Sequence, residues 1–104
     1  MREVLAGLVG SKVTRFQRVH DYHQLSIGNE TIDIFNPMAI EGPSSGQEMG
    51  ALEGLELKDV EESDDRLTLT FEHGLALRVD LRDGSYVGPE AVVYHREDGS
   101  AVVW

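Results

Sequence analysis

The sequence predicts a mainly β protein of the α+β class, in which antiparallel hairpins form two internal repeats and a C-terminal hairpin, with one or two short helices. Three observations lead to this prediction: apolar and polar residues alternate over short stretches, turn-forming pairs separate these stretches, and one pattern of residues occurs twice. The chain has 104 residues, the length of one domain, and no cysteine. A disulfide framework, a thiolate metal site and a cysteine nucleophile are therefore excluded.

The repeated pattern is L-x-G-L-x-x-x-x-V, which occurs at residues 5–13 and again at residues 52–60. Each copy leads toward a stretch with the alternation of a hairpin. We therefore divide the single domain, residues 1–104, into repeat 1 at about 4–36, a connector at about 37–50, repeat 2 at about 51–81 and a C-terminal hairpin at about 86–104.

Both repeats contain a period-two pattern around a turn signal, which is typical of a half-buried hairpin. In the first, the turn is Gly28-Asn29, and in the second it is His73-Gly74. The apolar positions that alternate with polar ones are Leu25, Ile27, Ile32 and Ile34 in the first hairpin, and Leu67, Leu69, Phe71, Leu75, Leu77 and Val79 in the second.

The C-terminal hairpin is predicted to turn at Asp98-Gly99, a pair that readily adopts a type I′ turn. Pairing outward from a two-residue turn places Tyr94 opposite Val103 and Val93 opposite Trp104. Trp104 would then end a strand and pack its indole on the sheet.

The helical prediction concerns two short segments at equivalent places. In the connector, Asn36-Pro37 and Gly42-Pro43 indicate turns, because proline fixes φ and restricts the residue before it. A short helix carrying Met49, Leu52 and Leu55 is expected after these turns, and residues 3–8 are expected to form a matching helical turn.

The charge is strongly negative and unevenly distributed. Nineteen acids against nine bases give a formal net charge of −10, and residues 36–104 carry all of it, with fifteen acids and five bases. Such a chain repels nucleic acid and anionic lipid and attracts basic partners. An excess of acid that only keeps the protein soluble is the alternative explanation.

The acids are densest at DVEESDDR, residues 59–66. A solvated strand end and turn would explain them, and a docking face for a basic protein would explain them too. The predicted partner-binding residues are Glu53, Glu56, Asp59, Glu61, Glu62, Asp64 and Asp65.

The stretch HDYHQ, residues 20–24, is the alternative centre of function. His20, Asp21 and His23 carry side chains that bind metals, but a strand would point them to different faces, so only a turn could bring all three to one ion. The repeat alignment makes residues 13–25 five positions longer than residues 60–67, which places HDYHQ in an inserted loop or a longer hairpin. A small metal-dependent enzyme or ligand binder that uses these residues is therefore kept as a second hypothesis.

The two copies of the repeated pattern, the stretch IDIFNP and the ending GPEAVVYHREDGSAVVW resemble small bacterial two-repeat β domains of unknown function. Some of those domains are similar to immunity proteins of polymorphic or contact-dependent toxin systems. The resemblance covers most of the chain. It implies a binder without enzymatic activity that neutralises a toxin by covering its active surface, and it implies no catalytic residue.

Our expectation is therefore an acidic, non-enzymatic protein-binding module without a cofactor, whose partner is a basic protein such as a cognate toxin or nuclease. The apolar run at the start, residues 4–9, is too short for a transmembrane helix, so we expect a cytoplasmic protein that is a monomer or a homodimer. A homo-oligomeric structural protein that pairs through the terminal strand, residues 100–104, is a third hypothesis.

Overall fold

The computed structural model of the chain describes residues 2–42, 49–86 and 88–104. The one α-helix in these residues is α1 (Arg2–Ala6), and three short 3-10 turns are η1 (Met49–Leu52), η2 (Glu72–Gly74) and η3 (Asp83–Ser85). The strands are β1 (Val13–Val19), β2 (Tyr22–Ile27), β3 (Glu30–Ile34), β4 (Met38–Glu41), β5 (Leu57–Glu62), β6 (Arg66–Phe71), β7 (Ala76–Asp80), β8 (Val92–His95) and β9 (Ala101–Val103).

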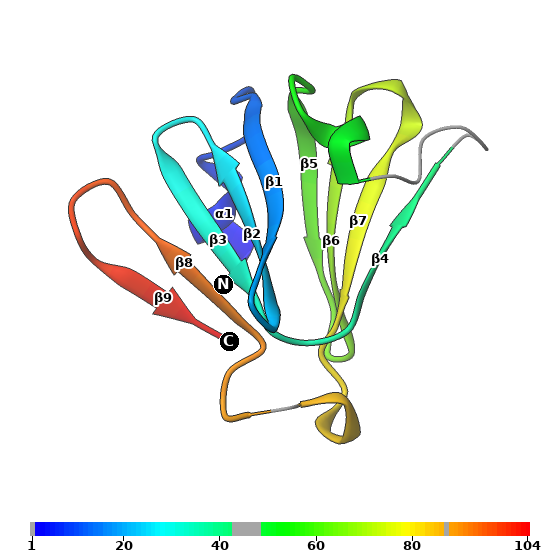
Figure 1. Cartoon of the computed structure of the whole chain (residues 1–104), viewed down its shortest axis with the longest axis vertical. Coiled ribbons are helices and arrows are strands. Elements are labelled where there is room, and N and C mark those ends of the chain that lie inside the picture. The colour runs from blue at the N-terminus through cyan, green and yellow to red at the C-terminus, as the bar shows by residue number, and fades with distance from the viewer. Residues whose placement is uncertain (1, 43–48, 87) are drawn as a thin grey trace.

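The strands form two antiparallel sheets, which lie next to each other in Figure 1 with β1 beside β5. The first sheet has the order β1-β2-β3-β8-β9, and the second has the order β4-β7-β6-β5. The prediction of a mainly β protein with antiparallel hairpins and short helical segments is confirmed. The turns at Gly28-Asn29 and at His73-Gly74 are also where the sequence places them.

Each repeat folds as a three-stranded meander, β1-β2-β3 in the first and β5-β6-β7 in the second. Both meanders have a register irregularity early in their first strand, and then Phe16 faces Leu25 in the first as Val60 faces Leu69 in the second. Equivalent residues of these two strand pairs are therefore 44 positions apart.

The repeat alignment from sequence is wrong by three residues, because it matched residues 5–13 with residues 52–60. The structure instead makes Leu8 and Gly10 equivalent to Leu52 and Gly54. Both glycines have positive φ, 96° and 86°, a conformation that glycine adopts without strain. Each repeat has two leucines three residues apart near this glycine, Leu5 and Leu8 in the first and Leu52 and Leu55 in the second, so the sequence pattern matched Leu52 with Leu5 instead of Leu8.

The two repeats exchange their last strands. β4 follows the first meander in sequence but pairs with β7 of the second, and β8 follows the second meander but pairs with β3 of the first. The crossing segments lie at the bottom of Figure 1 and are hydrogen-bonded at both ends: the amide of Phe35 donates to the Ala91 carbonyl, and the amide of Asp80 donates to the Pro37 carbonyl.

The two sheets also meet at the start of β1 and β5. The amide of Gly10 donates to the Leu57 carbonyl and, symmetrically, that of Gly54 donates to the Val13 carbonyl, at 2.8 and 2.7 Å. Lys12 and Glu56, which are equivalent residues, form the bridge between these bonds. In addition, α1 contacts β5 and η1 contacts β1, so each helical segment lies on the other repeat.

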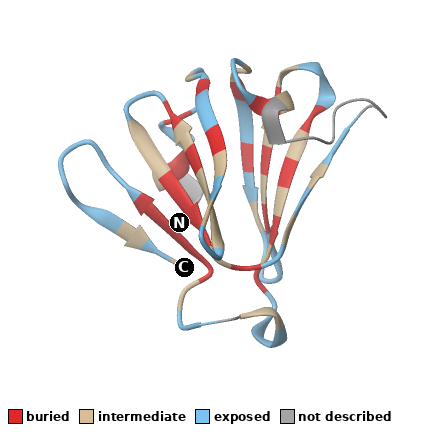
Figure 2. Ribbon diagram, viewed as in Figure 1, coloured by how far each residue is buried: buried red, intermediate tan, exposed pale blue. Residues whose placement is uncertain are grey.

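One hydrophobic core lies between the sheets and takes residues from both meanders and from the exchanged strand β8. Figure 2 shows its buried positions alternating with exposed ones along the strands. Leu25, Ile27 and Leu77 are fully buried, as the alternation predicts, and Leu57 at the start of β5 is fully buried too. A shared core follows from the strand exchange, because neither repeat has all the strands of its own sheet.

Two details of the sequence prediction are corrected. The connector was expected to contain only turns before its helix, but it contains β4, a short edge strand that gains its partner only through the exchange. The position of the predicted helix is occupied by η1, and the turn Gly42-Pro43 extends outside the described residues.

The register of the C-terminal hairpin also differs by one residue: Tyr94 faces Val102, and Val93 faces Val103. The reason is the turn, in which the Gly99 amide donates to the Arg96 carbonyl and Gly99 takes a φ of 90°. This three-residue loop with a bulged glycine replaces the two-residue turn. Trp104 does pack against the core, as predicted. No helix in the described residues is long and apolar enough to span a membrane.

Candidate functional site

The predicted partner-binding acids lie on and around β5, the edge strand of the second sheet. Glu53 and Glu56 precede the strand, and the five others lie on it or in the turn that follows. We call these five the acidic edge: Asp59, Glu61, Glu62, Asp64 and Asp65.

Glu53 and Glu56 are tied into the fold. A carboxylate oxygen of Glu53 accepts a hydrogen bond from the Phe16 amide at 3.3 Å, which links the segment before β5 to β1. Glu56 accepts a hydrogen bond from the Lys58 ammonium group at 3.0 Å, and this hydrogen bond raises the pKa of Lys58. These two acids therefore hold structure in addition to carrying charge.

The acids of the acidic edge differ in how free they are. Asp65 accepts a hydrogen bond from the Ser63 hydroxyl at 2.9 Å, and Glu62 is half-buried with one oxygen that has no partner. Asp59, Glu61 and Asp64 are exposed, and none of them makes a side-chain hydrogen bond or an ion pair within the described part of the chain. The last three acids are the ones that a partner could engage without disturbing the fold.

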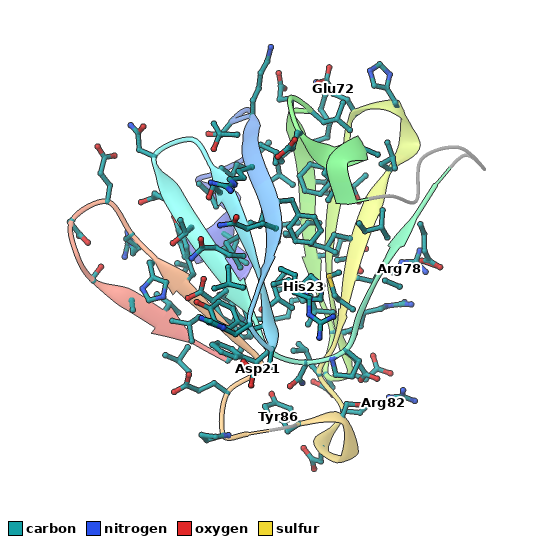
Figure 3. All side chains as sticks on the ribbon, in the orientation of Figure 1. Asp21, His23, Glu72, Arg78, Arg82 and Tyr86 are labelled. Atoms are coloured by element: carbon teal, nitrogen blue, oxygen red, sulfur yellow. The ribbon has the colours of Figure 1, made fainter. Side chains whose placement is uncertain are left out.

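A cleft that the sequence analysis missed lies next to the acidic edge. It has a volume of about 420 Å³ and lies at the end of the second sheet where β6 begins and β7 ends, beside β4. Met38 and Val79 are among its apolar lining, and its charged lining residues are Asp65, Arg66, Arg78, Asp80 and Arg82. Figure 3 shows Arg78 beside β4 and Arg82 below it.

Asp80 organises one wall of this cleft. Its carboxylate accepts hydrogen bonds from the Arg82 Nη2 atom at 2.6 Å, from the Arg82 Nε and amide nitrogens, and from the Ser85 hydroxyl at 2.8 Å. The hydrogen bonds from Arg82 and Ser85 hold the pKa of Asp80 far below its usual range. The carboxylate therefore stays ionised and holds the guanidinium of Arg82 at the cleft.

The arginines had a signal in the sequence. Arg66 and Arg78 alternate with the apolar positions of the second hairpin, so they point away from the core. The turn at His73-Gly74 sets Thr68 opposite Arg78, and Arg66 opposite Asp80. In the charge count along the chain, these arginines only offset part of the acidic charge. The cleft itself was not predicted, because β4, which forms its far wall, was not expected.

The structure separates the three residues of the metal hypothesis. His20 and Asp21 form the two-residue turn between β1 and β2, and His23 lies on β2. Figure 3 shows Asp21 low in the view and His23 higher, between the two sheets. No group of three or more histidine, cysteine, aspartate or glutamate side chains that could hold a metal ion occurs in the described ranges.

HDYHQ is not an inserted loop, which corrects the expectation from the repeat alignment. Residues 13–25 and 57–69 are equal in length, so His20-Asp21 corresponds to Asp64-Asp65. His20 has a φ of 54°, and its carbonyl accepts a hydrogen bond from the Arg18 Nε atom. Burial and the nearby charge of Arg18 lower the pKa of His23, which favours its neutral form.

The outward face of the first sheet carries a second polar group that the sequence analysis did not single out. The Gln17 amide donates to Gln24 at 3.4 Å, the Gln24 amide donates to Asp33 at 3.0 Å, and Asp33 lies 2.8 Å from the His95 Nε2 atom. Only 8% of Asp33 is exposed. These residues satisfy one another across four strands, and none of them lines the cleft of the second sheet.

Comparisons of the chain with protein-family models, with curated proteins and with solved structures gave no match.

Proposed function

We propose that this protein is a non-enzymatic, cytoplasmic protein-binding module that docks a basic partner on its acidic edge. The observation that supports this proposal is the alignment of Asp59, Glu61 and Asp64 along one edge strand and its turn, exposed and without partners in the described residues. The specific form that we propose is an immunity protein that neutralises a basic toxin or nuclease.

The physical argument rests on steering and on rigidity. Carboxylates that lie on one side of a chain with a net charge of −10 produce a field that accelerates the approach of a basic protein. A strand holds its charges in a fixed geometry, so a partner pays little to order them. A nuclease surface built to bind a polyanion would offer basic groups to match this edge.

The test is an affinity capture from the lysate of the source organism, loaded at low salt and eluted in salt steps, with mass spectrometry of the eluate. We would compare the wild type with the triple variant Asp59→Lys, Glu61→Lys and Asp64→Lys. The control is Asp21→Lys, Asp83→Lys and Glu97→Lys, which changes the net charge equally at exposed acids outside the acidic edge.

The expected result is one basic protein that is retained in stoichiometric amount by the wild type and the control, and is lost from the acidic-edge variant. Equal loss from both variants would show that net charge alone causes retention. Equal retention by both would place the interface elsewhere. Either of these results contradicts the proposed docking face.

A second candidate function is self-association through β9. This strand is the edge of the first sheet. Among the large hydrophobic residues that the structure describes, Val103 on this strand and Val9 are the exposed ones, at 47% and 45%. Exposed edges invite pairing with another chain. Light scattering over a range of concentrations tests this candidate, which fails if the protein stays monomeric at high concentration.

A further inference from the structure

We propose that the cleft between β4, β7 and the start of β6 is a binding site for a small organic anion with a carboxylate or phosphate group, held by Arg66 and Arg78. This site carries the opposite charge to the acidic edge and does not depend on the proposed docking function.

The first step of the argument is the concentration of basic residues. The chain has only nine lysines and arginines, and three of the five that follow residue 36 line this one cleft. All three are arginines. A planar guanidinium matches the two oxygens of a carboxylate or a phosphate, which a lysine ammonium group does not do.

The second step is that two of these arginines have free donors. Arg66 is exposed and makes no ion pair in the part of the chain that the structure describes. Arg78 pairs with Glu41 at 2.5 Å, but the two side chains are 41% and 48% exposed, so part of the guanidinium of Arg78 faces solvent, while its Nε atom is buried without an acceptor. An exposed ion pair contributes little free energy, so Arg78 can share its guanidinium with a ligand.

The third step is the geometry of the strands. Arg66 faces Asp80 across β6 and β7, and Arg78 lies two residues before Asp80 on β7. The two arginines are therefore diagonal neighbours on one face of the sheet, where Cβ atoms are about 7 Å apart, within reach of long side chains. Ala39, opposite Arg78 on β4, has a side chain too small to fill the space above it.

The fourth step concerns the size and the class of the ligand. The cleft volume of about 420 Å³ is within the usual range for small-molecule sites. The net charge of −10 repels a long polyanion, whereas a single anionic group is governed by the arginines near it. Asp80 holds Arg82 in place, and Pro37 and Ala39, which are exposed and line the cleft, offer a small apolar surface for the rest of an organic ligand.

The experiment is an NMR titration of the ¹⁵N-labelled wild type with sodium pyrophosphate in one arm and sodium malonate in the other. Sodium chloride at matched ionic strength provides the baseline. The proposal expects a saturable shift in at least one arm, concentrated on the amides of residues 38–41, 66–68 and 76–82. The arm with the tighter binding identifies phosphate or carboxylate as the preferred group.

Variants then test the residues. Arg66→Gln and Arg78→Gln should each weaken binding about tenfold or more, because each removes charge-assisted hydrogen bonds. The matched control, Arg15→Gln, removes an exposed arginine of β1 in the other sheet and should leave the affinity unchanged. Glu41→Gln releases Arg78 from its ion pair and should tighten binding.

Several results would overturn the proposal. The proposal fails if the amide shifts in both arms are no larger than those with sodium chloride. It also fails if the amides of Arg15 and Arg96 shift as much as those of the cleft. Equal weakening by Arg15→Gln would show general electrostatics, and unchanged or weaker binding by Glu41→Gln would remove Arg78 from the site. Thermal unfolding of each variant checks its fold, and the wild-type titration stands even if Arg78→Gln is unstable.

The result is also separable from the docking function. Asp59→Lys, Glu61→Lys and Asp64→Lys leave all three arginines of the cleft in place, so anion binding should survive in that variant. Loss of partner capture with retained anion binding would assign the two functions to two surfaces. Failure of the anion titration alone would leave the acidic edge untouched.

Discussion

The two meanders have the same backbone arrangement, but their outward faces have different chemistry. On the first sheet, Gln17, Gln24, Asp33 and His95 join in hydrogen bonds that leave little for a ligand to satisfy. On the second sheet, the positions equivalent to Gln17 and Gln24 are Glu61 and Thr68, beside the arginine-lined cleft.

This difference shows which positions the fold constrains. Inward positions repeat as apolar residues, with Leu25 matching Leu69 and Phe16 matching Val60, because both meanders bury one face in a shared core. Outward positions do not affect the core, so the two sheets could acquire different chemistry. One inward exception is His23, which stands where the second repeat has Leu67.

The largest expected effect tests whether the repeats contribute equally to one core. Leu25→Ala and Leu69→Ala remove equivalent side chains that are 0% and 1% exposed, and each should lower the free energy of unfolding by about 2 to 5 kcal/mol. Urea unfolding should remain a single transition in both variants, because the strand exchange joins the sheets. Two transitions, or a large effect from only one variant, would contradict a shared core.

The next effect concerns the two crossing segments. The first is held by a side chain, because the buried Asn36 amide donates to the Asp80 carbonyl at 2.7 Å. Asn36→Ala should cost about 1 to 2 kcal/mol, since the carbonyl loses its partner. The control is Asn29→Ala, an exposed turn residue for which chemical denaturation should show a much smaller change. Equal effects from the two variants would argue against a special role of this crossing.

A smaller effect is expected when a residue of the second sheet is placed at the equivalent position of the first. Gln24→Thr introduces the residue found at position 68 and breaks the hydrogen bonds of Gln24 with Gln17 and Asp33. We expect a loss of about 0.5 to 1.5 kcal/mol in urea unfolding, because Asp33 keeps its contact with His95. Arg15→Thr, at another outward position of that sheet, is the control, and a variant as stable as the wild type would show that this network contributes nothing.

The smallest effect depends on pH. The pKa of His23 is lowered from its ordinary value by burial and by the Arg18 charge, so the unfolded chain binds its proton more readily than the folded one. Wild-type stability should therefore fall as the pH drops below about 6.5, the ordinary histidine value.

His23→Leu, which introduces the residue of the second repeat, should remove that part of the pH dependence. The difference from the wild type should be less than about 1 kcal/mol, because the ring is only partly buried and solvent screens its charge. Thermal unfolding between pH 5 and 8 measures it, with His20→Asn as the control in the adjacent turn. Parallel pH profiles of His23→Leu and the wild type would contradict this role of His23.

Sequence reasoning predicted the local features well. Alternation identified β2, β3, β6 and β7, and glycine located their turns, because the side-chain period and the turn conformations are properties of neighbouring residues. It was less accurate where one residue changes a register, as at Gly99, since two loop lengths suit the same Asp-Gly pair. It also matched the repeats through Leu5 rather than Leu8, because both leucines fit a short pattern.

The same distinction holds for the candidate site, of which one part was predicted from the sequence and the other was not. The acids around β5 were found because they are close in sequence. The cleft was missed because its residues come from positions 37 to 82 and meet only when β4 pairs with β7.

Residues that are near one another along the chain thus account for the hairpins, the buried alternation and the acidic charge. The exchange of β4 and β8, the shared core and the arginine-lined cleft arise instead from contacts between segments that are far apart in the sequence. Such pairings depend on which distant strands bury the most apolar surface together, and no local pattern records that outcome.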